Sequence, residues 1–122
     1  MACVLIIDDD QGIRELFADA MEEAGHTVYQ AKNGLEGVKI AQEISPDVIV
    51  VDVFMPEMDG VEVILKLRKT EPDLRIIAVS GGGLSHNFQF LDLTNNLGAN
   101  LVLHKPILPD ELVEHVATCL KE

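Results

Sequence analysis

Two short apolar stretches of this chain end in aspartate, and these aspartates are the residues best suited to carry chemistry. Asp8 and Asp9 directly follow residues 4–7, and Asp52 directly follows residues 48–51. If both stretches are strands, their carboxylates can lie side by side. Like charges repel at that range, so the pKa of one carboxyl should rise unless a cation intervenes. Because hard oxygen ligands suit Mg²⁺, the pattern predicts an acidic, magnesium-binding pocket.

The size and charge of the chain limit what this pocket can serve. The chain has 122 residues, and we expect a single domain over residues 1–122. Its 48% hydrophobic content is enough for a core. The net charge of −12 disfavours direct binding to the phosphates of nucleic acids and to anionic membranes.

The sequence also indicates where the protein works. It has no apolar run of about 18 residues or more, so we expect no transmembrane helix. The first residues lack the basic region and cleavage site of a signal peptide. Cys3 and Cys119 lie near opposite ends without metal-ligand spacing, and the four histidines lack such spacing too. We therefore interpret the cysteines as free thiols of a cytoplasmic protein.

Apolar stretches alternate with amphipathic ones along the whole chain. The apolar stretches are short, rich in Val, Ile and Leu, and mostly without polar alternation, which is typical of parallel strands buried on both faces. Five strand–helix units in series predict an α/β fold, a doubly wound five-stranded parallel sheet with helices on both faces. The predicted strands are residues 3–7, 27–31, 47–53, 74–80 and 100–104, and the predicted helices are one that Gly25 ends and those at about 34–44, 60–70, 87–97 and 109–121.

The helical pattern also assigns faces and ends to these helices. Leu16, Leu35 and Leu65 fall on the apolar sides of the first three helices, so we expect them to face the core. Asp10 and Asp59 stand just before the first and third helices, where a carboxylate is favoured as a cap.

The carboxyl ends of the predicted strands collect the remaining candidate residues. Ligands of open parallel sheets bind at these ends, where the strand order reverses. Ser80 ends the fourth predicted strand, and Lys105 directly follows the fifth. A hydroxyl and an ammonium therefore join the carboxylates at one edge, which predicts a binding site rather than ordinary polar loops.

Over its whole length the chain resembles the receiver domain of two-component response regulators, including the chemotaxis ones. The segments that carry the resemblance are Leu5-Ile6-Ile7-Asp8-Asp9-Asp10, Val51-Asp52-Val53-Phe54-Met55-Pro56-Glu57-Met58-Asp59-Gly60, Ala78-Val79-Ser80, and Gly98-Ala99 followed by His104-Lys105-Pro106-Ile107. The second segment is highly specific, and all four stand in the right order. The resemblance implies a flavodoxin-like (βα)5 fold with strand order 2-1-3-4-5.

The resemblance also implies roles for individual residues. Asp52 would accept a phosphoryl group from a phosphohistidine of a sensor histidine kinase or a phosphotransfer protein. Asp8 and Asp9 would form the acidic pocket. Lys105 would pair with the phosphoryl oxygens, and Ser80 would hydrogen-bond the phosphoryl group once it is attached.

Mg²⁺ is the cofactor that the resemblance implies. Its protein ligands would be Asp9, Asp52 and the backbone carbonyl of Phe54, with Asp8 contributing directly or through a water molecule. Phosphoryl transfer passes through a loose transition state, so positioning and charge neutralisation supply most of the catalysis.

Some details near the site follow the family and others depart from it. Many relatives have a cis bond at the position of Lys105–Pro106, and we expect one here. Val102 replaces the aromatic residue that usually rotates as the switch hydroxyl, here Ser80, moves. The stretch around residues 81–83 is longer than usual and rich in glycine. Phe54 stands where relatives often carry a small or polar residue, and its bulk should shield an acyl phosphate from water.

Other interpretations of the acidic residues remain open. A pseudo-receiver binds partners without phosphorylation, but usually lacks an acidic residue or the lysine. A Mg²⁺-dependent aspartyl phosphatase needs an Asp-x-Asp motif, which Asp8 and Asp10 match, but also a cap for which this chain is short. A flavodoxin-like carrier is disfavoured because the aspartates would repel a flavin phosphate. We therefore predict a phosphorylation-controlled binding module rather than an enzyme, acting through a downstream protein partner or an output domain in a longer chain.

Overall fold

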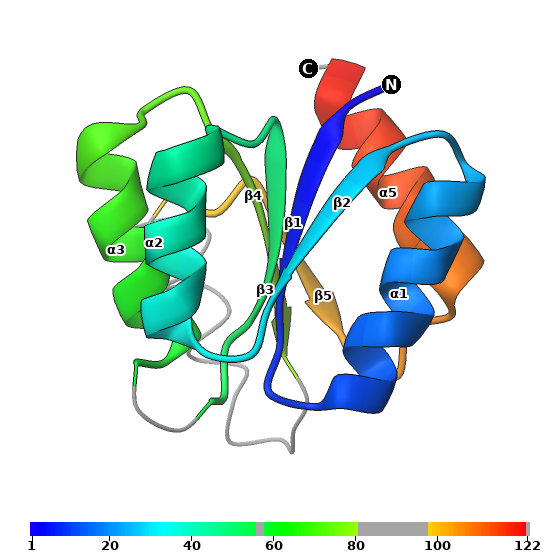
Figure 1. The fold of residues 1–122 in the computed structure, drawn as a ribbon, viewed down its shortest axis with the longest axis horizontal. Coiled ribbons are helices and arrows are strands. Elements are labelled where there is room, and N and C mark those ends of the chain that lie inside the picture. Colours follow the sequence, from blue (N-terminus) through cyan, green and yellow to red (C-terminus); the bar gives the residue numbers. More distant parts are fainter. Residues whose placement is uncertain (56–57, 81–97, 122) are drawn as a thin grey trace.

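A computed structural model describes residues 1–55, 58–80 and 98–121, and it shows a central parallel sheet between two layers of helices (Figure 1). The strands are β1 (Cys3–Ile7), β2 (Thr27–Ala31), β3 (Val48–Asp52), β4 (Arg75–Ser80) and β5 (Leu101–His104), and the helices are α1 (Gln11–Glu23), α2 (Gly34–Ile44), α3 (Gly60–Thr70) and α5 (Pro109–Lys121). The predicted helix at 87–97, the glycine-rich stretch at 81–83 and Glu57 lie outside the described residues. Every other predicted element is present within two residues of its expected ends.

The sheet has the expected order, β2-β1-β3-β4-β5, with all neighbouring strands parallel. The central strands β1, β3 and β4 are buried almost throughout, because helices cover both of their faces. The edge strands differ, since most residues of β2 are exposed and β5 has no fully buried residue. The expectation of two-sided burial is therefore confirmed for the interior of the sheet and wrong for its edges.

Two apolar clusters hold the layers together. Helices α2 and α3 cover one face of the sheet, and α1 and α5 cover the other (Figure 1). Side chains alternate between the faces of a strand, so residues that are neighbours in β1 belong to different clusters. On the α2–α3 side the buried cluster includes Leu5, Ile7, Ile49, Val51, Ile64, Leu67 and Ile76, and on the α1–α5 side it includes Val4, Ile6, Phe17, Met21, Val50, Ile77, Leu112 and Val116.

Three leucines predicted to face the core are exposed instead. The exposed fraction is 53% for Leu16, 58% for Leu35 and 42% for Leu65. In α1 the buried positions include Phe17 and Met21, so the helix is rotated to put its largest side chains, and not Leu16, against the sheet. An apolar stripe wider than the contact area leaves its margin in solvent.

In α2 the core-facing positions are glycines rather than Leu35. Gly34 and Gly37 are both buried, and Gly37 packs directly on Ile7 of β1. A Cβ atom built at Gly37 would lie 2.5 Å from Ile7 Cδ1, closer than real contacts allow. A close approach to β1 at Gly37, and to Met58 in the segment before α3 at Gly34, leaves no room for a side chain, and hydrophobicity alone does not reveal it.

The helix ends agree with the sequence. The side chain of Asp10 accepts a hydrogen bond from the Ile13 N–H and caps α1, and Asp59 caps α3 through the Glu62 N–H. Gly25 follows α1 with φ of +97°, a left-handed conformation that suits glycine. Among the described residues, no helix combines the length and apolar character needed to cross a membrane.

Candidate functional site

The register of the sheet places two of the predicted aspartates level with each other. Ile7 of β1 pairs with Val51 of β3, so Asp8 and Asp52 are the next residues on neighbouring strands. Carboxylate oxygens of Asp8, Asp9 and Asp52 all lie within 4.8 Å of one another. Asp8 is 3% exposed and Asp52 is 6% exposed, while Asp9 is open to solvent. Two of the three charges are therefore held in a largely buried pocket.

Lys105 brings a positive charge into this pocket from the other side. Its Nζ donates to Asp8 Oδ2 at 3.2 Å and to Asp52 Oδ2 at 3.0 Å. The Lys105 N–H donates to the Ser80 carbonyl at 2.8 Å, which continues the β4–β5 pairing past the end of β5. The Lys105–Pro106 peptide bond is cis, as expected.

Backbone groups orient the two buried carboxylates. The Asp10 N–H donates to Asp8 Oδ1 at 2.9 Å, and the Phe54 N–H donates to Asp52 Oδ1 at 3.0 Å. The guanidinium of Arg14 in α1 donates to the carbonyl of Asp8 at 2.9 Å. Sequence reasoning missed Arg14, whose only signal was a cation placed shortly after the aspartates.

Burial has opposite consequences for the pKa values of Asp8 and Lys105. Loss of solvent is the largest influence on Asp8 and raises its pKa, opposed by the Asp10 N–H and by Lys105, while the charge of Asp52 raises it further. The expected rise is therefore present, but desolvation, not like-charge repulsion, is its main cause. For Lys105, burial lowers the pKa, but the hydrogen bond and charge of Asp52, followed by those of Asp8, outweigh it and raise the pKa overall.

The acidic group fits a divalent metal ion. Mg²⁺ holds oxygen ligands at about 2.1 Å, so its neighbouring and opposite ligands are separated by about 3 to 4 Å. Oxygens of Asp8, Asp9 and Asp52 lie within 4.8 Å of one another, close enough for small side-chain movements to bring them around one ion. One ammonium does not neutralise three carboxylates, so a cation with two charges also suits the electrostatics. Such an aspartate triad is typical of the magnesium site of receiver domains.

The remaining predicted residues lie on β4 and β5 or directly after β3. Ser80 is 2% exposed and lies at the end of β4, between the strands that carry Asp52 and Lys105. Phe54 follows β3 and is 38% exposed. Val102 pairs with Ala78, is half-buried, and packs against the α2–α3 side of the core rather than against the aspartates.

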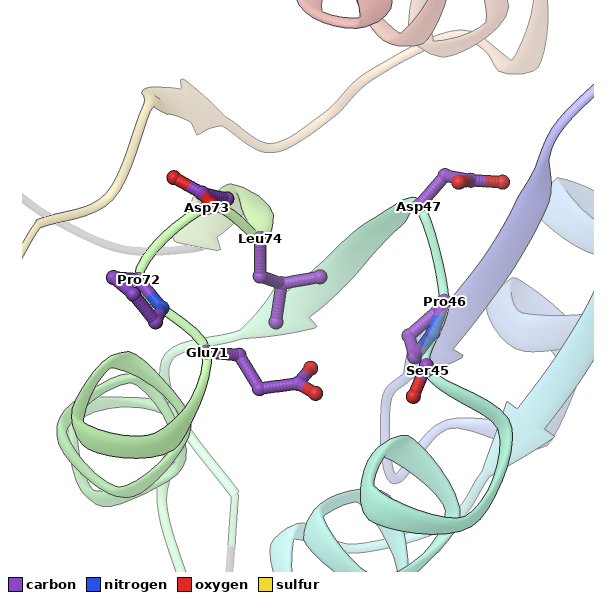
Figure 2. A pocket seen from close by; sticks show the side chains of 7 residues that line it. All are labelled: Ser45, Pro46, Asp47, Glu71, Pro72, Asp73 and Leu74. Carbon is purple, nitrogen blue, oxygen red and sulfur yellow. The ribbon is translucent and has the colours of Figure 1, made fainter.

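The structure also contains a hollow of about 340 Å³ that is not part of this site. Figure 2 shows it between the loops that lead into β3 and β4, lined by Ser45, Pro46, Asp47, Glu71, Pro72, Asp73 and Leu74. These residues precede their strands, whereas the buried aspartates lie at the ends of theirs. The hollow therefore lies at the amino end of the sheet, opposite the edge where ligands of such folds bind.

The comparison with known families agrees with this geometry. Residues 4–117 match the response regulator receiver domain. The chain belongs to that family. Receiver domains are phosphoacceptor modules of two-component signal transduction and form a signalling family rather than an enzyme family, and they partner with histidine kinases or phosphotransferases. Both the sequence resemblance and the predicted fold are confirmed.

Curated relatives and solved structures extend the likeness. The chain is 34% identical to response regulator MprA of Mycobacterium ulcerans over 97% of its own length and 50% of that protein, and 30% identical to sporulation initiation phosphotransferase F of Bacillus subtilis over 93% and 89%. It is 42% identical over 66% of its length to sensor kinase CckA of Brucella abortus, but spans 9% of that protein. Chemotaxis protein CheY4 of Vibrio cholerae superposes with a TM-score of 0.85 at 30% identity, covering 98% of each chain. The chain thus spans half or less of some relatives and most of others.

Proposed function

We propose that Asp52 of this receiver domain is the phosphoacceptor, taking a phosphoryl group from a phosphohistidine of a sensor histidine kinase or phosphotransfer protein in the cytoplasm. The observation that supports this most is the placement of the Asp52 carboxylate. It lies 3.0 Å from the Lys105 ammonium and within 4.8 Å of oxygens of Asp8 and Asp9. A nucleophile, a cation and a metal-ligand set thereby meet at one point.

The reaction needs little covalent chemistry from the protein. A carboxylate oxygen of Asp52 attacks phosphorus, an acyl phosphate bond forms, and the bond between phosphorus and the histidine nitrogen breaks with its electron pair passing to the imidazole. The Phe54 N–H and the Lys105 ammonium fix the carboxylate before the donor arrives. Lys105 then faces the charge that accumulates on the phosphoryl oxygens, where a fixed cation is most effective.

The metal ligands proposed for Mg²⁺ are Asp9, Asp52 and the backbone carbonyl of Phe54, with Asp8 contributing directly or through water. When bound, the ion neutralises the carboxylates and stabilises the charge of the transferred group. Asp9 is exposed whereas Asp8 is buried and already engaged with Lys105. That difference supports Asp9 as the more direct ligand.

Output is proposed to follow from Ser80 and the surface around β5. Ser80 ends the strand between those that carry Asp52 and Lys105, so its hydroxyl can bond a phosphoryl group attached to Asp52 and report its presence. Val102 occupies the second switch position without an aromatic ring to rotate, so the change at Ser80 must reach the surface by backbone and packing shifts. The receiver, proposed as one domain over residues 1–122, then acts on a downstream protein partner or on an output domain of a longer chain.

Phosphorylation of the purified chain by acetyl phosphate, with and without Mg²⁺, tests the proposal when followed by intact mass. We expect a Mg²⁺-dependent gain of one phosphoryl group that Asp52→Asn abolishes. Asp19→Asn is the matched control, because Asp19 is an exposed aspartate of α1 and should leave the gain unchanged. No gain from acetyl phosphate or from a phosphorylated phosphotransfer protein would instead identify a pseudo-receiver that binds partners without phosphorylation.

A further inference from the structure

Arg68, in the last turn of α3, makes several side-chain hydrogen bonds although it lies outside the acidic pocket. Its Nη1 donates to the carbonyls of Glu71, Pro72 and Leu74, at 3.3, 2.9 and 2.7 Å. These carbonyls belong to the loop between α3 and β4, which forms one wall of the hollow in Figure 2. A guanidinium presents its donors in a planar fork, so one side chain can bind several carbonyls at once.

The other arm of the same guanidinium reaches a segment far along the chain. Its Nη2 donates to the Gly98 carbonyl at 2.6 Å and to Asn100 Oδ1 at 3.2 Å. Gly98 has φ of +88°, and a Cβ atom built there would lie 3.0 Å from Arg68 Nε. A glycine is therefore required at this point both by its backbone conformation and by the closeness of Arg68.

Asn100 connects Arg68 to the sheet through two hydrogen bonds with Ile76. Its N–H donates to the Ile76 carbonyl at 2.8 Å, and its Oδ1 accepts from the Ile76 N–H at 2.7 Å. Asn100 is the residue directly before β5, and Ile76 lies in β4. Arg68 therefore binds the same Asn100 side-chain oxygen that accepts from the Ile76 N–H where β4 and β5 begin to pair.

Strand β5 gains from this additional hydrogen bond because its own packing is limited. It is four residues long, lies at the edge of the sheet, and has no fully buried residue. Leu101 and Leu103 pack on the α1–α5 cluster and Val102 on the α2–α3 cluster, but each is only partly buried. Partial burial specifies register less strongly than full burial does, and a slip by one residue turns every side chain to the other face. Such a slip would put His104 or Pro106 at the position from which Lys105 reaches Asp52.

We propose that Arg68 is a positioning residue for phosphoryl transfer: through Asn100 it fixes the register of β5 and thereby places Lys105 beside Asp52. The effect on phosphorylation rests on the function proposed above, whereas the effect on register does not. Within the described ranges, the hydrogen bonds of Arg68 go to Glu71, Pro72, Leu74, Gly98 and Asn100, all of which lie outside the acidic pocket.

A purely stabilising role of Arg68 makes a different prediction. The proposed carboxylate ligands of Mg²⁺ lie at the ends of β1 and β3, whose pairing does not involve Arg68. If Arg68 acts through β5 alone, its loss withdraws the ammonium from the carboxylates but leaves them in place. Mg²⁺ then binds at least as tightly, since Lys105 no longer competes for the same oxygens. A general loosening of the fold would weaken metal binding and phosphorylation together.

Arg68→Met tests the inference, with Lys66→Met as the matched control, since it removes an exposed cation from the same helix. With saturating Mg²⁺, we expect the acetyl phosphate rate constant of Arg68→Met to fall about tenfold, because small misplacements of a catalytic group have effects of this size. The Mg²⁺ dissociation constant should not rise, and amide hydrogen exchange at Lys105 should become faster. Arg68→Lys, which keeps the charge but not the fork, should lie between, and Lys66→Met should match the wild type.

Asn100→Ala provides a second route if Arg68→Met does not fold, because it removes the same acceptor and keeps the backbone bond to Ile76. Asn100→Ala should also lower the phosphorylation rate without raising the Mg²⁺ dissociation constant, but by a smaller factor than Arg68→Met. An unchanged rate, a joint loss of rate and Mg²⁺ affinity, or undiminished protection of the Lys105 amide in these variants would overturn the inference. If the wild type itself takes up no phosphoryl group, the proposed function fails instead, and hydrogen exchange alone decides whether Arg68 sets the register of β5.

Discussion

At the carboxyl end of the sheet Asp8 and Asp52 are buried and share one ammonium, whereas at the amino end Asp47 and Asp73 are exposed beside a hollow. At the amino end, too, a backbone N–H orients a carboxylate, since the Cys3 N–H donates to Asp47 Oδ2 at 2.7 Å. Asp47, Glu71 and Asp73 make the lining of the hollow acidic too, so the two ends differ in the burial and pairing of their carboxylates and not in the number of them.

Lys105 at the carboxyl end and Arg68 near the amino end also differ in what they bind. Lys105 binds charged carboxylates and is a compact point charge that a phosphoryl group or metal can displace or share. Arg68 binds mostly neutral backbone carbonyls in a fixed fork and has few donors left for a ligand. The comparison teaches that buried, converging opposite charges favour a reactive site. A cation bound mainly to backbone carbonyls instead supports the structure.

The largest expected effect comes from removing the cation of the reactive end. Lys105→Met should slow phosphorylation of Asp52 by about 100-fold, since a fixed cation at developing charge contributes on that scale. The same change should tighten Mg²⁺ binding, because the carboxylates lose their internal counter-ion. Stopped-flow phosphorylation and a Mg²⁺ titration measure the two quantities. A fall in both the phosphorylation rate and the Mg²⁺ affinity would show that Lys105 only stabilises the fold.

Metal removal sharpens the comparison between the two acidic ends. Mg²⁺ at about one hundred times its dissociation constant should stabilise the wild type by about 2.7 kcal/mol. Asp9→Asn should lose most of this gain in a chemical unfolding experiment, and EDTA should abolish it in the wild type. Asp73→Asn, the matched change at the amino end, should retain it. A similar loss in both variants would mean that metal binding does not distinguish the two ends.

Phe54 gives a smaller effect on the lifetime of the product. Phe54 lies two residues after Asp52, donates its N–H to that carboxylate and is 38% exposed, so we expect its ring to hinder the approach of water to an acyl phosphate. Phe54→Asn should speed the loss of the phosphoryl group several-fold, measured by intact mass after the donor is removed. Leu35→Asn, at an exposed apolar residue of α2, is the control. Equal lifetimes for wild type and Phe54→Asn would refute the shielding role.

The smallest expected effect concerns the stability of the Mg²⁺-free protein against pH. The pKa of Asp8 is raised in the folded state, mainly by burial, so the folded protein binds more protons there than the unfolded chain does. Stability from this group is therefore lost as the pH rises from about 3.9, the usual Asp value, through the folded pKa. Asp8→Asn should be more stable than the wild type at pH 7, and the difference should shrink toward pH 4. Urea unfolding over that range measures it; a difference that grows as the pH falls would contradict the assigned direction.

Much of this protein follows from the local order of its residues. Short Val- and Ile-rich runs alternating with amphipathic stretches predicted the strands and helices, because strand and helix periods differ. The aspartates, Ser80 and Lys105 were found because each stands where its strand ends. Asp10 and Asp59 were assigned as caps correctly, since capping depends on neighbours a few residues away.

The sequence determined by itself whatever depends on such local order: the elements, their ends, and which polar residues reach the carboxyl edge. Tertiary structure alone decided the rotation of α1 that exposes Leu16, the close approach that buries Gly37, and the separation of the edge strands from the core. It also decided the hydrogen bonds of Arg14 and Arg68, whose acceptors are mostly carbonyls supplied by other segments. Every residue carries a carbonyl, so no sequence pattern marks the ones that a distant arginine will bind, and only the packed chain selects them.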